Sequence, residues 1–201
     1  MFTGIVERSV SVVGLETRRE GLRMLIDVPW SDTLPGESIA LNGACLTIAN
    51  IAQINATTHR LAFDVVRETL DKTNLDRLGV GSLVHVERAM RAGDRFDGHF
   101  VQGHVDGVAM ITRHVADPAD WRIGCRAPDE LVRYLVPKGS VALDGVSLTL
   151  AKVDGADFEV ALIPTTLQIT QLGRREIGWP LNIECDTLVK SVVRVLELRG
   201  H

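Results

Sequence analysis

Short apolar runs recur along most of the chain, and residues such as Gly, Pro, Asn and Asp separate one run from the next. The runs are rich in β-branched residues and shorter than typical helices, so they predict β-strands. Their close spacing, without long helical stretches in between, indicates antiparallel pairing. The clearest runs span residues 38–49, 60–66, 82–87, 140–153 and 158–163.

Each half of the chain holds about six such strands, which suits a small closed barrel because closure leaves no exposed strand edge. The predicted fold class is therefore all-β, with two six-stranded antiparallel barrels in tandem, joined near residues 92–98. The domain boundaries that follow are residues 1–97 for the first barrel, 98–187 for the second barrel and 188–201 for a C-terminal segment.

That C-terminal segment differs from the rest, because its apolar positions over 188–198 recur at helical spacing opposite charged positions. The apolar positions are Leu188, Val189, Val192, Val193 and Leu196. An amphipathic helix has to bury this stripe either on its own barrel or against other copies of the chain. We favour the second arrangement, an oligomer.

The two predicted barrels are copies of one another in sequence. Ser-Ile-Ala-Leu-Asn-Gly-Ala-Cys-Leu-Thr at 38–47 aligns without a gap on Ser-Val-Ala-Leu-Asp-Gly-Val-Ser-Leu-Thr at 140–149, an offset of 102 residues. A second block aligns at an offset of 97, where residues 68–75 match 165–172. Order and spacing persist across both blocks, so the chain is a tandem duplication. Two copies of this length disfavour a solenoid, which stacks three or more shorter units.

Composition narrows the possible classes of function. With 45 % hydrophobic residues the chain has ample apolar surface for packed cores. The net charge of −4 and the lack of a Lys and Arg run argue against a nucleic-acid partner. No stretch approaches the roughly 18 apolar residues of a membrane span, and we expect a cytoplasmic protein.

The three cysteines, Cys45, Cys125 and Cys185, lie far apart and form no C-x-x-C pair. This spacing argues against both a disulfide framework and a zinc knuckle. Any chemistry of a thiol therefore has to come from one cysteine acting alone.

Four motifs stand in order on the duplicated frame. They are Met-Phe-Thr-Gly-Ile-Val-Glu at 1–7, Asn-Gly-Ala-Cys-Leu-Thr at 42–47, Gly-His-Phe-Val-Gln-Gly-His-Val-Asp-Gly at 98–107 and Asp-Gly-Val-Ser-Leu-Thr at 144–149. Together they resemble the riboflavin synthase family over nearly the whole chain. The resemblance implies Greek-key, flavin-reductase-like barrels and a homotrimer held by the C-terminal helices. It also implies active sites between the N-terminal barrel of one subunit and the C-terminal barrel of its neighbour.

The resemblance also implies a reaction. In this family two molecules of 6,7-dimethyl-8-ribityllumazine give riboflavin and 5-amino-6-(D-ribitylamino)uracil by transfer of a four-carbon unit. One lumazine loses a proton from the methyl group on C7, while water or a side chain attacks C7 of the other. No metal or organic cofactor is implied, so the protein supplies orientation, desolvation and proton relays. A possible association with lumazine synthase stays open.

Cys45 has Ser147 at the matching position of the second copy, so the two halves differ chemically. A lone cysteine is ordinarily a small buried hydrophobe. The resemblance instead places Cys45 in the ligand pocket of the first barrel, as a nucleophile or proton-relay group. For that role the thiol has to be partly exposed and able to ionise.

His99 and His104 are five residues apart, which puts them on opposite faces of a regular strand and makes them a poor metal pair. The resemblance implies that His104 contacts the ligand, where a neutral imidazole shuttles protons near neutral pH. His99 has two interpretations, a role in the site and a structural hydrogen bond near the link between the barrels.

Ser38 and Thr47 lie an odd number of positions apart along the chain, as do Ser140 and Thr149. Along one strand such pairs point to opposite faces unless a bulge intervenes. The resemblance implies that Thr47 and Thr149 contact the heterocycle. It makes Ser38 a proton-relay candidate, with an ordinary strand serine as the alternative.

Segments 64–69 and 162–167 resemble the stretches that bind the ribityl chain and the ring edge. Glu68 has no acidic counterpart at Thr165, so a surface charge is an equal interpretation for it. The full set of expected substrate contacts is Gly4, Ile5, Val6, Cys45, Leu46, Thr47, Asp64, Val65, Val66, Arg67, Glu68, Thr69, Gly103, His104, Val105, Lys138, Ser147, Leu148, Thr149, Leu162, Ile163, Pro164, Thr165, Thr166 and Leu167.

Lys138 and Asp186 also match the family, where Lys138 reaches the ligand held by the neighbouring barrel. Without the resemblance, Lys138 would be a solvated charge and Asp186 the N-cap of a helix. Two positions depart from the family pattern, Asp97 in place of a second glycine and Thr165 in place of a histidine. They affect the local shape rather than a group that the chemistry requires.

Two other functions compete with the enzyme. Relatives of this fold hold lumazine or flavin as light-emitting antennae without converting it, and such proteins are expected to have lost reactive groups or one pocket. Here Cys45, Thr47, His104, Ser147 and Lys138 are all present, which favours an enzyme. A pure interaction scaffold would leave the paired motifs without a purpose.

Overall fold

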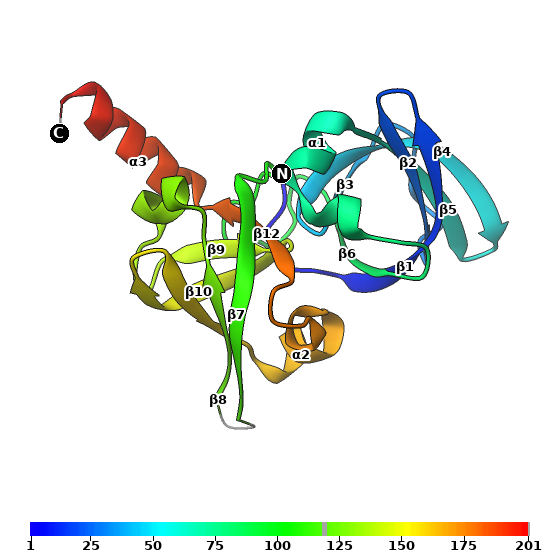
Figure 1. Ribbon diagram of the computed structural model, residues 1–201. Coiled ribbons are helices and arrows are strands. Elements are labelled where there is room, and N and C mark those ends of the chain that lie inside the picture. The colour runs from blue at the N-terminus through cyan, green and yellow to red at the C-terminus, as the bar shows by residue number, and fades with distance from the viewer. Residues whose placement is uncertain (118–119, 201) are drawn as a thin grey trace.

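The computed structural model describes residues 1–117 and 120–200, so residue 201 of the C-terminal segment lies outside the described part. Two closed six-stranded antiparallel barrels lie side by side (Figure 1), which confirms the predicted fold class. The strands of the first barrel are β1 (Arg8–Arg18), β2 (Gly21–Val28), β3 (Ser38–Leu41), β4 (Ala44–Asn55), β5 (Thr58–Val66) and β6 (Leu83–Arg88). Those of the second barrel are β7 (Gly107–Asp117), β8 (Asp120–Arg126), β9 (Ser140–Leu143), β10 (Val146–Asp154), β11 (Asp157–Ala161) and β12 (Pro180–Cys185).

The short helices that follow β5 and β11 sit at equivalent places in the two copies, whereas the 3₁₀ turn Asp129–Tyr134 and α3 belong to the second copy. The α-helices are α1 (Arg67–Lys72), α2 (Pro164–Ile169) and α3 (Thr187–Leu198), and the 3₁₀ turns are Asn74–Arg77, Asp129–Tyr134 and Leu172–Arg174. The strands follow the circuit β1-β2-β5-β4-β3-β6 in the first barrel and β10-β11-β8-β7-β12-β9 in the second. These are the same circuit with each strand moved six places along the chain, so the duplication extends to the topology.

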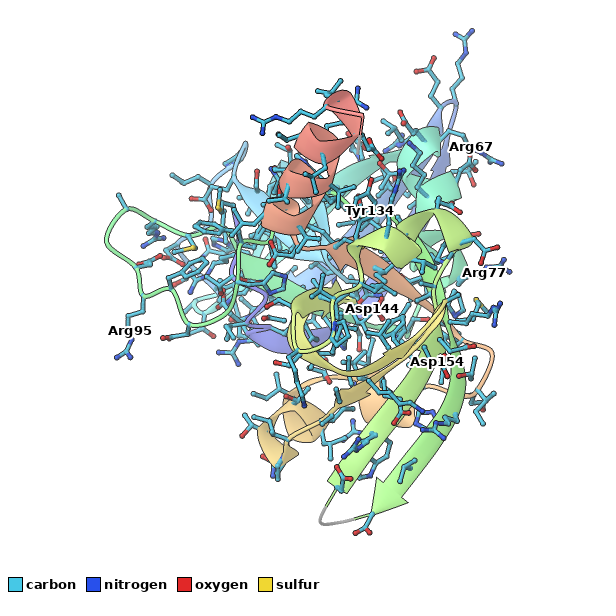
Figure 2. All side chains as sticks on the ribbon, turned by 90° about the vertical axis from the view of Figure 1, so that its left-hand side faces the viewer. Arg67, Arg77, Arg95, Tyr134, Asp144 and Asp154 are labelled. Atoms are coloured by element: carbon cyan, nitrogen blue, oxygen red, sulfur yellow. The ribbon has the colours of Figure 1, made fainter. Side chains whose placement is uncertain are left out.

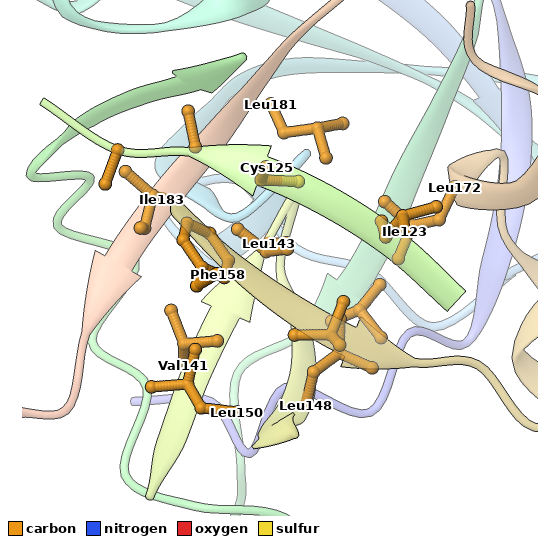
Figure 3. Packing of buried hydrophobic residues seen from close by; sticks show 14 of the residues in the cluster. Ile123, Cys125, Val141, Leu143, Leu148, Leu150, Phe158, Leu172, Leu181 and Ile183 are labelled. Carbon is orange, nitrogen blue, oxygen red and sulfur yellow. The ribbon is translucent and has the colours of Figure 1, made fainter. Parts of the chain in front are cut away.

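Side chains fill the interior of each barrel, because alternate residues of every strand point inward. In β2 the inward positions are Met24, Ile26 and Val28, all fully buried. The second barrel is filled in the same way, with Phe158 packed among residues such as Leu143 and Ile183 (Figure 3). The described interiors of both barrels are therefore packed cores.

The apolar run 38–49 is not one strand. It reverses at Asn42-Gly43, where both residues have positive φ values of 44° and 79°, as a two-residue hairpin turn requires. Ser38 and Thr47 are consequently direct cross-strand partners on β3 and β4, and their side chains share one face. The prediction that they point to opposite faces was wrong, because it assumed a continuous strand.

The second copy has the same hairpin, so the prediction for Ser140 and Thr149 was wrong for the same reason. The run 140–153 reverses at Asp144-Gly145, with φ values of 45° and 78°, and pairs Ser140 with Thr149 across β9 and β10. The two hairpin tips meet between the barrels, where a Cβ atom on Gly43 would lie 2.6 Å from the backbone nitrogen of Gly145. Glycine is required at both tips by this close approach as well as by φ.

A buried polar cluster joins the barrels around these tips, and Figure 2 shows Asp144 near the middle of the molecule. Asp144 Oδ1 accepts hydrogen bonds from Asn74 Nδ2 at 2.7 Å and from Asn182 N at 2.8 Å. Asn182 Nδ2 donates to Asn42 O at 2.8 Å, and His85 Nδ1 lies 2.9 Å from Asp144 O. Because three of these four hydrogen bonds run between the two copies, the cluster fixes the barrels relative to each other.

The C-terminal helix forms where the apolar pattern predicts it. Asp186 caps α3 by accepting a hydrogen bond from Leu188 N at 2.8 Å, and Lys190 pairs with Asp106 at 2.9 Å. The helix projects from the second barrel (Figure 1), and much of its apolar side is exposed, including Val192 and Leu196. Within residues 1–117 and 120–200, no helix combines the length and apolar character needed to cross a membrane.

Candidate functional site

The structure forms two equivalent surfaces, one on the outside of each barrel. On β4 the side chains of Cys45 and Thr47 face outward, half-buried and exposed respectively, while Leu46 points into the core. On β10 the same alternation exposes Thr149 and leaves Ser147 half-buried, with Leu148 in the core. The expected contacts Leu46 and Leu148 therefore belong to the cores and can offer a ligand only backbone atoms.

Each surface is completed by the segment that precedes the first strand of the opposite copy. Residues 101–106 cross onto the first barrel, where Cys45 N donates a hydrogen bond to Gly103 O at 2.9 Å. Residues 1–6 cross onto the second barrel, where Ser147 N donates to Gly4 O at 2.8 Å. Phe2 and Val101 form the β-bridge at which the two segments meet.

Only glycine fits where the segments touch the strands. A Cβ atom on Gly103 would lie 2.5 Å from the Cβ of Cys45, and one on Gly4 would lie 2.7 Å from the Cβ of Ser147. Both glycines also have φ values near 79°, which other residues rarely adopt. The structure thus brings Gly103 to Cys45, and Gly4 to Ser147, as matched pairs.

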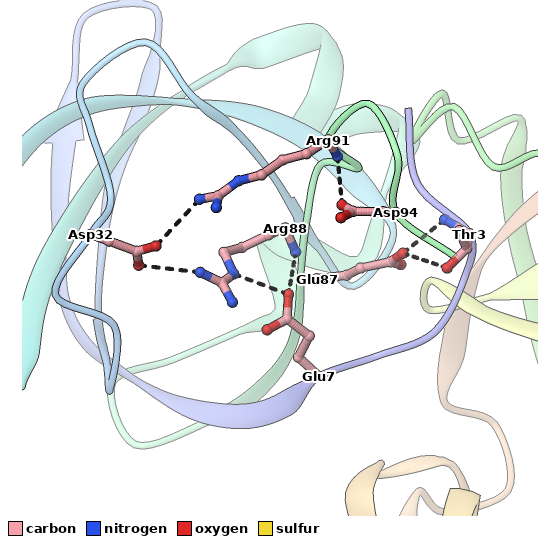
Figure 4. A network of polar contacts seen from close by, with 7 residues as sticks. All are labelled: Thr3, Glu7, Asp32, Glu87, Arg88, Arg91 and Asp94. Atoms are coloured by element: carbon pink, nitrogen blue, oxygen red, sulfur yellow. Dashed lines mark hydrogen bonds and ion pairs between the residues drawn. The ribbon is translucent and has the colours of Figure 1, made fainter. Parts of the chain in front are cut away.

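The surface of the first barrel carries three of the expected catalytic residues. His104 is exposed directly after Gly103, and Ser38 stands opposite Thr47. A cavity of about 440 Å³ opens beside Ser38. Its charged lining consists of Glu7, Glu37, Arg88, Arg91 and Asp94, of which Figure 4 shows all but Glu37.

The surface of the second barrel contains a hydrogen-bonded pair that includes His99, for which the sequence allowed either a role in the site or a structural hydrogen bond. His99 Nδ1 lies 2.7 Å from Ser147 Oγ. Burial lowers the pKa of His99 below its usual range, although the charge of Asp186 acts in the opposite direction. His99 is therefore neutral near pH 7, and its buried Nε2 has no hydrogen-bond partner in the described residues. Such an arrangement suits the transfer or acceptance of a proton.

Segment 64–69 lies at the end of β5 and in α1, where the side chains have different environments. Asp64 forms a bidentate ion pair with Arg23 across the strands, at 2.7 Å for both bonds. Glu68 pairs with Lys72 and is largely exposed, which agrees with a surface charge. The remaining side chains are Val65, buried in the core, Thr69, half-buried, and the exposed Val66 and Arg67.

Segment 162–167 occupies the same place at the end of β11 and in α2. Leu162 is buried in the core, like Val65 of the first copy. Thr166 O accepts a hydrogen bond from Thr170 Oγ1 at 2.7 Å. The other members are the exposed Ile163, Pro164 and Thr165 and the half-buried Leu167.

Four further expected contacts lie apart from these segments or partly inside the cores. Val6 is buried in the core of the second barrel, and Val105 packs against the core of the first. Ile5 is exposed after Gly4, at the place that His104 occupies after Gly103. Lys138 is exposed in the turn before β9 and has a positive φ of 66°.

The comparisons with known proteins agree with this architecture. The lumazine binding domain family model matches twice, at residues 3–89 and 102–186. LumP complexed with 6,7-dimethyl-8-(1'-D-ribityl) lumazine has the same fold, with a TM-score of 0.80 and 21 % identity over 92 % of this chain and 99 % of LumP. LumP complexed with riboflavin gives a TM-score of 0.80 at 22 % identity over the same shares of both chains. The fold and the paired surfaces thus define a tandem lumazine-binding-domain protein.

Curated relatives narrow this class. Riboflavin synthase of Mycobacterium tuberculosis is 40 % identical over 100 % of both chains. Riboflavin synthase of Bacillus subtilis is 38 % identical over 98 % of this chain and 90 % of the relative, and that of Escherichia coli 35 % over 98 % and 92 %. The chain belongs to the riboflavin synthase family.

Proposed function

We propose that this chain is a riboflavin synthase. It takes two molecules of 6,7-dimethyl-8-ribityllumazine, transfers a four-carbon unit from one to the other, and releases riboflavin and 5-amino-6-(D-ribitylamino)uracil. The observation that carries the proposal is the presence of two matched surfaces in one chain, Cys45 with Gly103 and Ser147 with Gly4. A reaction between two copies of one molecule needs two similar binding surfaces.

The difference between the surfaces supports different tasks for the two bound molecules. The first surface offers the half-buried thiol of Cys45 beside the exposed imidazole of His104. The second offers the Ser147 hydroxyl in contact with a neutral His99. We assign Cys45, His104 and Ser38 to proton transfer or nucleophilic attack at one lumazine. The same reasoning adds His99 and Ser147 at the other.

The lumazine ring and ribityl chain are neutral and rich in hydroxyl and carbonyl groups. Backbone groups at Gly4 and Gly103, the hydroxyls of Thr47 and Thr149, and the ends of segments 64–69 and 162–167 offer hydrogen bonds of this kind. Apolar side chains fill the interior of each barrel in the described part of the chain, so a site on the outer surface needs a second wall to exclude water.

We further propose that a neighbouring subunit provides this wall in a homotrimer. The exposed apolar side of α3, with Leu188 58 % and Val192 59 % exposed, supports an interface between copies of the chain. In that assembly the N-terminal barrel of one subunit faces the C-terminal barrel of the next, and Lys138 reaches the ligand of the neighbouring barrel.

The proposed location of the protein is the cytoplasm. The three cysteines carry free thiols, which supports a reducing location of this kind.

A lumazine carrier is the second candidate function, because LumP has the same fold at a TM-score of 0.80. One experiment separates the two functions. The purified protein is incubated with 6,7-dimethyl-8-ribityllumazine alone, and absorbance follows the loss of lumazine and the gain of riboflavin. We expect one riboflavin for every two lumazines consumed, and a much slower reaction for Cys45→Ser. Binding without conversion would identify a carrier instead.

A further inference from the structure

Two buried glutamates stand at equivalent places on the last strands of the two barrels. Glu87 on β6 is 5 % exposed and Glu184 on β12 is 3 % exposed. The two residues match each other in the sequence repeat at the offset of 97, but neither side chain lies among the expected ligand contacts. A buried carboxylate is costly unless hydrogen bonds compensate for the loss of water. The partners of these two carboxylates therefore indicate what they do.

Glu184 holds the segment that crosses onto the first barrel. Its Oε1 accepts a hydrogen bond from Gln102 N at 2.7 Å, and its Oε2 accepts one from Gly103 N at 2.9 Å. The carbonyl of the same Gly103 accepts the hydrogen bond of Cys45 N. The peptide before His104 is thus fixed on one side by a strand of the second barrel and on the other by a strand of the first.

Glu87 does the same for the opposite crossing (Figure 4). Its Oε1 accepts from Thr3 N at 2.8 Å and from Thr3 Oγ1 at 3.1 Å, and Gly4 N lies 3.2 Å from both carboxylate oxygens. The carbonyl of Gly4 accepts the hydrogen bond of Ser147 N. Each glutamate therefore belongs to one barrel and acts on the surface of the other.

We propose that Glu184 and Glu87 are positioning residues, each of which completes the ligand surface of the opposite barrel. Glu184 sets the Gly103-His104 peptide against Cys45, and Glu87 sets the Gly4-Ile5 peptide against Ser147. Their importance for catalysis rests on the proposed function, whereas the crossed geometry can be tested without any substrate.

The hydrogen bonds to the crossing segments favour the ionised carboxylates of Glu87 and Glu184, while burial opposes ionisation. Burial raises the pKa of both carboxyls to about 7, and the backbone N–H donors of the crossing segments act against this rise. Two neighbouring N–H groups match two carboxylate oxygens in charge and number. A glutamine has one oxygen and one NH₂ group, so it leaves one of the two N–H groups without an acceptor.

Alkylation of thiols in the intact protein provides the test. Of the three cysteines, Cys45 is half-buried, while Cys125 and Cys185 are at most 1 % exposed and report on global unfolding. The first reporter is Cys45 itself, and the second is the thiol introduced by Ser147→Cys in a Cys45→Ser background. Iodoacetamide rates at each thiol are measured by mass spectrometry of peptides, with Glu184→Gln and Glu87→Gln as matched variants.

We expect a crossed result. Glu184→Gln should speed alkylation of Cys45 about tenfold, as expected when a buried N–H loses its acceptor, and leave the thiol at position 147 unchanged. Glu87→Gln should speed alkylation at position 147 and leave Cys45 unchanged. The buried Cys125 and Cys185 should stay protected in both variants. Equal effects of each variant on both reporters, an effect on its own barrel alone, or no effect would overturn the proposal.

Hydrogen exchange in the unmutated protein covers the case in which a variant does not fold. The amide protons of Gln102, Gly103 and Cys45 should share one opening rate, because release of the segment breaks all three hydrogen bonds. If the Cys45 amide exchanges with its β4 neighbours while Gln102 and Gly103 exchange much faster, the proposal fails. A crossed alkylation result without riboflavin formation would refute the proposed function and leave the positioning role intact.

Discussion

His99 Nδ1 and Ser147 Oγ lie 2.7 Å apart on the surface of the second barrel, although 48 residues separate them in the chain. Gly98 makes the approach possible, because a Cβ atom there would lie 1.9 Å from the carbonyl oxygen of Thr3. The imidazole is neutral near pH 7, since burial lowers the pKa of His99. The serine hydroxyl and the neutral imidazole therefore share one hydrogen bond, and either group can relay a proton to or from a bound ligand.

The first prediction concerns the acid side of the pH profile. As the pH falls through the lowered pKa of His99, the imidazole takes up a proton and can no longer accept one during the reaction. Activity should therefore hold down to about pH 6.5, the usual histidine value, and decline only below it. Ser147→Ala should lower kcat/KM about tenfold or more, and His99→Asn should remove the acid decline.

A matched pair elsewhere in the chain provides the control. His59 Nδ1 lies 2.7 Å from Thr33 Oγ1 on the first barrel, and neither residue is among the expected site residues. His59→Asn should leave the acid decline of kcat/KM unchanged. If this variant also flattens the profile, the decline belongs to general destabilisation rather than to His99.

The second prediction concerns Lys138, whose φ of 66° costs about 1–2 kcal/mol for a residue with a Cβ atom. The equivalent turn of the first copy has Gly36, with φ at 89°. Lys138→Gly should raise the free energy of unfolding by up to about 1 kcal/mol, after the greater entropy of glycine in the unfolded chain is subtracted. The same variant should lower kcat/KM, because the ammonium group is lost.

Lys138→Met separates the two effects, since it keeps the strain and removes the charge. It should lower kcat/KM as much as Lys138→Gly does and leave the urea midpoint unchanged. Full activity in both variants would show that Lys138 is only a surface residue.

The third prediction follows from the buried carboxyl of Asp144, whose Oδ2 has no partner among the described residues. Burial raises its pKa to about 7 from the ordinary 3.8. A raised pKa contributes stability below about pH 4 that is lost as the pH rises through 7. Asparagine does not titrate, so Asp144→Asn should gain stability relative to the unmutated protein by at most about 1.4 kcal/mol per pH unit across this range.

Urea unfolding at pH 5 and pH 8 measures this difference, which should be on the order of 2 kcal/mol. His85 acts in the opposite direction, because burial lowers its pKa to about 4, but the substitution leaves His85 in place. Asp157→Asn, which removes an exposed partner of Arg126, is the control and should show no such pH dependence. An equal effect of Asp144→Asn at both pH values would contradict the prediction.

The fourth prediction tests the oligomer. Val192 and Leu196 lie one turn apart on the exposed side of α3, so glutamate at either position would place a charge in an interface between helices. Val192→Glu should yield monomers in analytical ultracentrifugation and lose riboflavin formation with the shared site. Arg194→Gln removes only an exposed ion pair with Glu197 and should keep the assembly. Monomers of the unmutated protein would refute the trimer.

The periodicity of the sequence predicted the strands of the barrels and the C-terminal helix, because these depend on local patterns of apolar residues. The duplication was predicted from the match between residues 38–47 and 140–149. The hairpin at Asn42-Gly43 was missed although its signal was present, since Asn-Gly is the preferred pair for a two-residue turn. A two-residue turn at that point is enough to place Ser38 beside Thr47, because the strands on either side of it then pair residue by residue.

The crossing segments and the His99 contact with Ser147 were beyond such patterns. Thr3 and Gln102 have different side chains, and what the structure uses is the backbone N–H that every residue except proline offers. Burial of Glu87 and Glu184 was equally hidden, because glutamate is usually exposed and only its partners reveal the exception.

Because residues 1–6 and 101–106 each cover the opposite barrel, each barrel depends on the other to complete its outer surface. A single-barrel chain would leave its own outer strand uncovered and could cover it only by exchanging segments with a second copy, as swapped dimers do. The tandem chain has the geometry of such a dimer after its two halves became one polypeptide. Once joined, the halves were free to diverge, so that one surface carries a thiol at Cys45 and the other a hydroxyl at Ser147.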